Sequence, residues 1–427
     1  MRRNLNKIVA FAIGVSVISG SIIPAMAETK VTYIDLATIN QQKNQASNKP
    51  VLSLEDAMET AVSNSETLSL LDKTISYTEK INDVTEKINN VSEDNDMIED
   101  YEKDYTEEKN DLSIKALKQK RDYQEDILKT NVRDSYNQIV TKQVELESLK
   151  LNLDIQNKRN SDMKLKNSLG LATSIDTEDF DLNIQKMKNG IKTSEDSLKL
   201  LQYKFKNLTG IDVSKYTLNR DIEYDKFEID GSVENYLDDI VEQYIEESLK
   251  QEQIDNEKDY LDELRDDVKI TSSDKAPKKD EYYSTVTNDD GTESRKFDAA
   301  GYKTALSDYI SKLSNYAKYL GSKLSNISDQ TTLNEEKKAF KEALRQYYIL
   351  LINTENTIEL DKKNIELNNQ KLKNTKLQYD LGQITKDKYD EAVKNNLDLE
   401  SELRTDIEAY NQYKDNIQKP WLKLTIQ

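Results

Sequence analysis

The sequence predicts an all-α fold built from two long helical hairpins in tandem. No proline lies between Pro50 and Pro277, or between Pro277 and Pro420, and a helix interior excludes proline by roughly 3 kcal/mol. Charged residues make up 33% of the chain and aromatic residues only 7%, as is typical of long helices with narrow apolar seams. Two similar glycine turns, at Gly170 and Gly382, lie 212 residues apart, about half the chain. Repetition at that period predicts an internal duplication.

The N-terminal 27 residues have the pattern of a secretory signal peptide. A basic start at residues 2–7 precedes a mostly apolar run at 8–23, and small residues at 25–27 supply a cleavage site. An uncleaved anchor helix is the alternative, although the apolar run is short for a membrane span. We expect residues 1–27 to be removed and 28–50 to form a polar linker. No second long apolar run follows, so we expect no transmembrane helix in the mature chain.

Composition narrows the classes of function. The net charge is −19, and losing the three signal-peptide cations makes it −22, so nucleic-acid phosphates would be repelled. The chain has no cysteine and no histidine, which excludes disulfides and removes the usual general base and zinc ligand. No catalytic pair stands out among the 80 Asp and Glu residues. We therefore expect no enzyme, no cofactor and no metal. The acidic run from Glu93 to Glu108 lacks the spacing of a calcium loop and is better interpreted as a solvated helix face or loop.

Each half of the chain shows the same plan. In the first half Ser53 is placed to cap a helix, with Asp56 three residues on. The expected helices there run to about Lys87, from Asn110 to about Lys166, and from after Gly170 to about Leu208, where Gly210 ends the helix. The second half opens after Gly231, has a polar break at 270–300, and continues with helices to Leu381 and to about Gln418. Within the break, the sequence around Asp290-Gly291 predicts a small β-hairpin.

Apolar seams predict how these helices pack. After Gly170 the seam steps by three and four through Ile184, Met187, Ile191, Ser194, Leu198, Leu201, Phe205 and Leu208. Before Gly382 it steps by seven through Leu351, Ile358, Ile365, Leu372 and Tyr379, with first-half counterparts Ile139, Leu146 and Leu153. A second stripe, Leu360, Leu367 and Leu381, lies two residues away and so on nearly the opposite flank. Seams on both flanks predict neighbours on both sides, as in a ring or sheet of helices; a compact bundle with one wide apolar face is the alternative.

The two glycines are then explained as hairpin tips. A positive φ is accessible to glycine at little cost, which suits a tight turn between antiparallel helices. Thr173 and Thr385 are placed to cap the returning helices.

Several motifs together resemble the TolC-like outer-membrane efflux protein family. "LSLEDAMETAVSNS" resembles the family's opening pattern, "SLGLATS" and "YDLGQIT" resemble its two hairpin-tip turns, and "LQYKFKNLTG" resembles the end of its first repeat. The resemblance covers about residues 52–427. It implies two repeats, 51–215 and 216–427, and a homotrimer whose helices form a long tube. It also implies a passive exit duct, exported to the cell envelope, that works with an adaptor protein and a pump in the inner (cytoplasmic) membrane.

The resemblance also assigns roles to tip residues. The turns that would dock the adaptor are Gly170, Leu171 and Thr173 in the first hairpin, and Gly382, Gln383 and Thr385 in the second. A tip latch would involve Tyr379 and Asp176. Of the acidic residues that form a gate in the family, this sequence keeps Glu391. Asp179 could add negative charge to the gate from the other hairpin. An arginine–threonine link of the family is absent, because its positions hold Ile384 and Ile175.

The chain departs from the family at its two membrane-strand positions. Residues 88–112 and 268–300 are too polar to supply a lipid-facing band of alternating apolar residues. We therefore expect no transmembrane β-barrel strands and no direct membrane span, as in a protein that stands in the cell wall of a single-membrane cell. The alternative function is an exported coiled-coil surface protein with structural or interaction roles and no channel.

Overall fold

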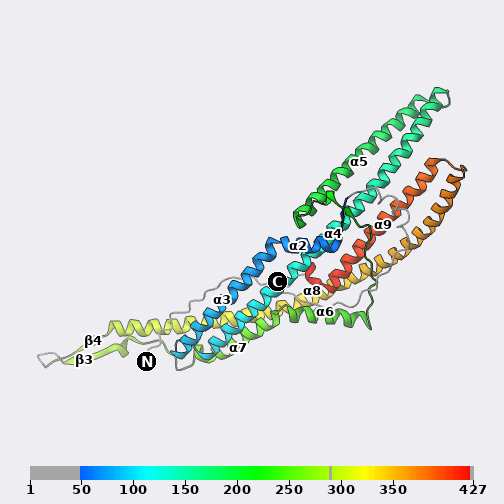
Figure 1. Cartoon of the computed structure of the whole chain (residues 1–427). Helices are drawn as coiled ribbons and strands as arrows, with labels where there is room; N and C mark the ends of the chain where they lie inside the picture. The colour runs from blue at the N-terminus through cyan, green and yellow to red at the C-terminus, as the bar shows by residue number, and fades with distance from the viewer. Residues whose placement is uncertain (1–48, 288–290, 424–427) are drawn as a thin grey trace.

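The computed structural model describes residues 49–287 and 291–423 (Figure 1). The expected signal peptide and nearly all of the expected linker lie outside the described residues. The first half contains α2 (Leu54–Asn64), α3 (Glu66–Asp94), α4 (Asp100–Ser168) and α5 (Ser174–Thr209). The second half repeats this order with α6 (Val233–Glu247), α7 (Lys250–Val268), α8 (Ala299–Asp380) and α9 (Lys386–Gln418). The all-α fold with two tandem hairpins is confirmed.

The hairpins α4–α5 and α8–α9 lie side by side, joined along α4 and α9, and both tips point to the same end of the molecule (Figure 1). Away from the tips, α3 contacts α4, α4 contacts α7, and α7 contacts α8. These contacts make a layer of four helices in that order. Among the described residues, none of the helices combines the length and the apolar character that crossing a bilayer requires.

Short strands complete the fold. The parallel strands β1 (Val51–Leu52) and β2 (Thr217–Leu218) join the start of the first half to its end. The antiparallel strands β3 (Tyr283–Thr287) and β4 (Glu293–Phe297) form the expected hairpin, at the end opposite the tips (Figure 1). Its residues 288–290 are outside the described part, and Gly291 has a φ of 82°.

The predicted seams are buried. In α5 every predicted position is buried or half-buried, and in α8 Leu351 and Ile358 are fully buried. The duplication is also seen in burial, because residues 212 apart are buried in both halves. Examples are Val132/Leu344 and Ile139/Leu351 in α4 and α8, and Ile191/Leu403 and Phe205/Ile417 in α5 and α9. The second stripe of α8 is left uncovered, with Leu360, Leu367 and Leu381 all more than half exposed.

The local signals for helix ends are also confirmed. The Ser53 hydroxyl accepts a hydrogen bond from the Asp56 N–H at 3.0 Å and caps α2. Gly210 follows α5 with a φ of 81°. A side chain there would also meet the Asn64 amide, which donates to the Thr209 carbonyl at 3.0 Å.

One expectation from the sequence was wrong in detail. The acidic segment that was expected to interrupt the first half is helical on both sides of a short turn at residues 95–99. Its charges find partners, since Lys103 donates to Glu93 at 2.6 Å, and Tyr105 stacks on Tyr260 with ring centroids 4.3 Å apart. In α4 the predicted seam position Leu153 is half-buried, and Ile155, two residues further on, is buried as well. Because α4 packs on both α5 and α9, its buried face is wider than a single heptad stripe.

Candidate functional site: the two hairpin tips

The two tips have the same backbone geometry. In the first, Leu171 N–H donates to the Lys166 carbonyl at 2.8 Å and Gly170 N–H to the Asn167 carbonyl at 2.9 Å. In the second, Gln383 and Gly382 make the same two bonds, at 2.8 and 2.9 Å, to carbonyls 212 residues further on. This is the pattern of a Schellman turn, which needs a left-handed residue after the helix. Gly170 and Gly382 supply it, with φ of 71° and 68°.

The returning helices begin at the predicted threonines, but the two caps differ. Thr173 and Asp176 form a capping box at α5: Thr173 N–H donates to the Asp176 carboxylate at 2.9 Å, and Asp176 N–H donates back to the Thr173 hydroxyl at 3.2 Å. The Thr173 hydroxyl and N–H hold the pKa of Asp176 below its usual range. Thr385 is the N-cap of α9 without a side-chain bond to the helix backbone. Its hydroxyl instead bonds to Asp387 and lowers the pKa of that carboxyl.

Large apolar side chains project from both tips. Their exposed fractions lie between 59% and 75%, far above what a seam residue shows. The residues are Leu165, Leu169, Leu171, Ile175, Leu377 and Leu381. Neither glycine has a neighbour that a side chain would meet within 4 Å, so the space beside each turn is open. Together these features make an accessible apolar surface at one end of the molecule.

The residues predicted for a latch and gate are placed as follows. Tyr379 lies against Tyr389 of the same hairpin, with ring centroids 5.3 Å apart and ring planes 9° from parallel. Asp176 is engaged in its own capping box, and Asp179 is exposed on the same helix. Glu391 forms an ion pair with Arg159 of the other hairpin. Within the part of the chain that the structure describes, Glu391 therefore contacts the other hairpin, whereas the contacts of Tyr379 and Asp176 stay within their own hairpins.

The contact between the hairpins is polar along most of its length. Besides Arg159–Glu391, Lys158 lies 3.7 Å from Asp387, and nearer the base Arg133 donates to Asp415 at 2.5 Å. Burial raises the pKa of Asp415, against the opposing effect of Arg133. Sequence reasoning missed Lys158 and Arg159, because a charged residue on a long helix carries no local signal that another hairpin faces it.

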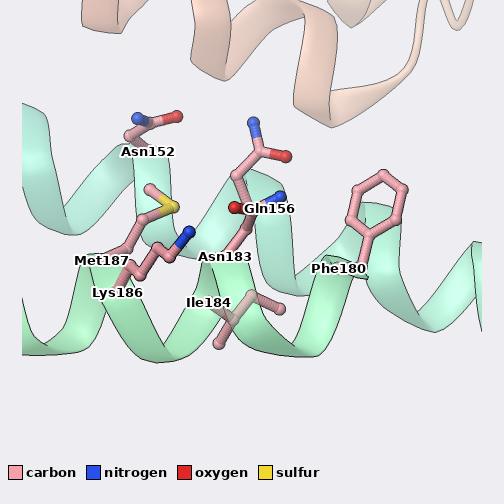
Figure 2. Close-up of a pocket in the computed structure, with 7 residues that line it drawn as sticks. All are labelled: Asn152, Gln156, Phe180, Asn183, Ile184, Lys186 and Met187. Atoms are coloured by element: carbon pink, nitrogen blue, oxygen red, sulfur yellow. The ribbon is translucent and has the colours of Figure 1, made fainter. Parts of the chain in front are cut away.

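A groove runs between α4 and α5 below the first tip, with a volume of about 320 Å³. Figure 2 shows Asn152 and Gln156 rising from α4, with Phe180 and Met187 on α5. Lys186 is the one ionisable residue of its lining, so the groove offers no acid–base pair for chemistry.

Comparison with known proteins gives matches of structure alone. No family model matches the chain, and no curated protein matches its sequence. The Campylobacter jejuni CmeC outer membrane channel is similar at 13% identity, over 95% of this chain and 94% of that one, with a TM-score of 0.45. The chain is also similar to a membrane protein from Pseudomonas aeruginosa, at 11% identity over 85% of this chain and 92% of that one, with a TM-score of 0.46. It is similar as well to the outer membrane protein VceC from Vibrio cholerae, at 10% identity over 84% of this chain and 95% of that one, with a TM-score of 0.44.

Proposed function

We propose that this chain is a TolC-like exit duct of an efflux or secretion system. In this proposal residues 1–27 direct export to the cell envelope and are removed, and the repeats 51–215 and 216–427 each contribute one hairpin. Three copies form a helical tube that substrates cross passively. The tips dock an adaptor protein, which connects the tube to a pump in the cytoplasmic membrane.

The observation that supports this function best is the matched pair of tips. Two segments 212 residues apart adopt the same turn, at the same end of the molecule, and both present exposed leucines. A turn that only reversed the chain would gain nothing from exposing large apolar side chains. An exposed leucine does not contribute the free energy that its burial away from water would provide. An exposed apolar surface rimmed by polar residues is characteristic of a protein-binding site.

The test compares glycine variants at and away from the tips. Gly170→Val and Gly382→Val place a β-branched residue at positive φ, and Gly190→Val is the matched control, because Gly190 lies inside α5 at a helical φ with open space around it. The partner is the purified adaptor encoded with a pump in the same genome. We expect adaptor affinity to fall at least about tenfold in the tip variants, which is about 1.4 kcal/mol, with helicity by circular dichroism unchanged. Equal affinities for all three variants and the wild type would exclude tip docking and leave the coiled-coil surface protein as the better account.

A further inference from the structure

The two halves of the molecule have separate hydrophobic cores. One core gathers buried residues of the first half, among them Val132, Tyr136 and Ile139 of α4. The other gathers buried residues of the second half, among them Ile407 and Tyr410 of α9. Because α4 and α9 nevertheless lie against each other, the contact between these two helices depends on side chains that belong to neither core.

Polar and charged side chains fill this contact. Arg404 of α9 is 3% exposed, and its Nε donates to the Thr141 hydroxyl of α4 at 3.2 Å. The Thr141 hydroxyl donates in turn to the carboxylate of Glu408, one turn further along α9, at 2.9 Å. Glu400 lies one turn before Arg404 and is 8% exposed. Since residues four apart share a helix face, two carboxyl groups and one guanidinium occupy successive turns of the same face of α9.

Glu408 has competing neighbours on α4. Arg133 and Asp134 both face it, as does Arg404 of its own helix. Arg133, however, already pairs with Asp134 at 2.9 Å. Burial raises the pKa of Glu408 above its usual value, and this effect outweighs those of its hydrogen bond and of the two arginines. The charged form of Glu408 is therefore disfavoured in this contact.

Glu400 is placed in the same way. Glu147 of α4 faces it, together with Arg404 and with Arg220, which lies in the segment that joins β2 to α6. Arg220 pairs with Glu147 at 2.7 Å, so Arg404 is shared between Glu400 and Glu408. Burial raises the pKa of Glu400, against the opposing effect of both arginines. Charge on either glutamate thus works against the packing of α9 on α4.

We propose that the α4–α9 contact is pH-sensitive, in that uptake of a proton by Glu400 or Glu408 strengthens the packing of the second hairpin on the first. The loss of one negative charge leaves one carboxylate for the shared guanidinium of Arg404. A raised pKa in the folded state gives a contribution that is present at low pH and is lost as pH rises through the raised value. The contact is therefore tighter in mild acid than at pH 8. This inference concerns a single chain and does not rest on the proposed function.

The chain carries its own probe of this contact. Trp421 is its only tryptophan, and it follows α9 directly. Its ring stacks on Tyr123 of α4, with centroids 4.6 Å apart and planes 6° from parallel, and its indole N–H donates to Asp126 of α4 at 3.2 Å. Acrylamide is uncharged, so its access to the ring reports packing and not charge. We expect acrylamide to quench tryptophan fluorescence at least about twofold more strongly at pH 8 than at pH 5.

Substitutions test whether the two glutamates cause this difference. Glu408→Gln keeps an acceptor for Thr141 and removes the charge, so its quenching at pH 8 should approach the wild-type value at pH 5. Glu400→Gln should act in the same direction. The matched control is Glu402→Gln, which makes the same charge change at an exposed position of α9 and should keep the wild-type pH dependence. A wild type whose quenching is equal at both pH values, or a Glu402→Gln variant that behaves like Glu408→Gln, overturns the inference.

A second measurement locates the change. Because the chain has no cysteine, spin labels can be attached at chosen exposed positions in chains diluted with unlabelled chains. Lys150→Cys with Asn395→Cys spans α4 and α9, and Lys150→Cys with Asp196→Cys spans α4 and α5 across an apolar seam. We expect the distance distribution of the first pair to be broader at pH 8 than at pH 5, and that of the second pair to stay the same. Equal behaviour of the two pairs would contradict a pH effect at the α4–α9 contact.

Discussion

The rings of Tyr379 and Tyr389 stack across the second tip, with centroids 5.3 Å apart and planes 9° from parallel. Tyr379 is the last residue of the α8 seam and Tyr389 lies in the first turns of α9, so this contact clamps the hairpin next to its glycine. The resemblance to the efflux family implied a different use of Tyr379, through a hydroxyl bond to Asp176. The stack on Tyr389 depends on the ring of Tyr379, whereas the bond to Asp176 would depend on its hydroxyl. Substitutions that remove one and keep the other can therefore separate the two roles.

Removing the ring at position 379 should weaken the tip, and removing only the hydroxyl should not. Aromatic pairs contribute roughly 0.5–1.5 kcal/mol beyond area burial, so Tyr379→Ala should lower the free energy of unfolding by at least that amount. Tyr379→Phe keeps the stack and should match the wild type in thermal melts of the single chain. If Tyr379→Phe costs as much as Tyr379→Ala, the hydroxyl carries the interaction, and a latch to Asp176 becomes the better account.

The capping box of the first tip should make that tip sensitive to acid. Thr173 holds the pKa of Asp176 below its usual value, so the carboxylate stabilises the fold above the unfolded pKa and this contribution is lost as pH falls through the lowered value. We expect amide exchange in the first turn of α5 to accelerate at low pH. The first turn of α9 should respond less, because protonation of Asp387 removes its bond to the Thr385 hydroxyl but breaks no capping box. Thr173→Ala should remove the difference, at a cost of roughly 1 kcal/mol at neutral pH. Equal protection of both turns in the wild type at all pH values would contradict this role.

A pair of carboxyl groups between α8 and α9 should oppose stability at neutral pH. Burial and the hydrogen bond to Asp406 raise the pKa of Asp361 to about 6. A raised pKa in the folded state means that stability is present at low pH and is lost as pH rises through about 6. Asp361→Asn should therefore stabilise the protein at pH 8, by roughly 1 kcal/mol once solvent screening is allowed for, and should have little effect near pH 4. The control is Glu366→Gln, at an exposed position of the same helix; a stabilisation of equal size there would point to net charge and not to the pair.

Two positions of α8, two residues apart, should respond very differently to truncation. Ile358 is 0% exposed and Leu360 is 61% exposed. Ile358→Ala should cost about 2–5 kcal/mol, because it leaves a cavity in a packed seam. Leu360→Ala should change the free energy of unfolding of the isolated chain by less than about 0.5 kcal/mol. Urea melts at low protein concentration measure both values. Similar costs at the two sites would mean that the second stripe is covered within one chain.

The sequence by itself determined the features that depend on local physics. Backbone φ decides where glycine is needed, and so Gly170, Gly210 and Gly382 were identified as turns or ends before any fold was known. Caps at Ser53 and Thr173 act over three residues. The seam ending in Ile365, Leu372 and Tyr379 could be predicted because heptad spacing fixes which face of a helix is apolar.

Only the tertiary structure decided which partner each face meets. Arg159 and Glu391 lie 232 residues apart, and Asp361 meets Asp406 across a seam; neither pair has a signal in the sequence near it. The acidic segment before Asn110 was expected to break the helix, yet it is helical because contacts with α7, such as Tyr105 on Tyr260, stabilise a pattern that is too polar to be recognised alone. Periodicity likewise predicted a second apolar flank on the helix before Gly382, but not that this flank stays uncovered within the chain, as it does at Leu360, Leu367 and Leu381. That outcome depends on the order in which the helices pack, which residue spacing along one helix does not encode.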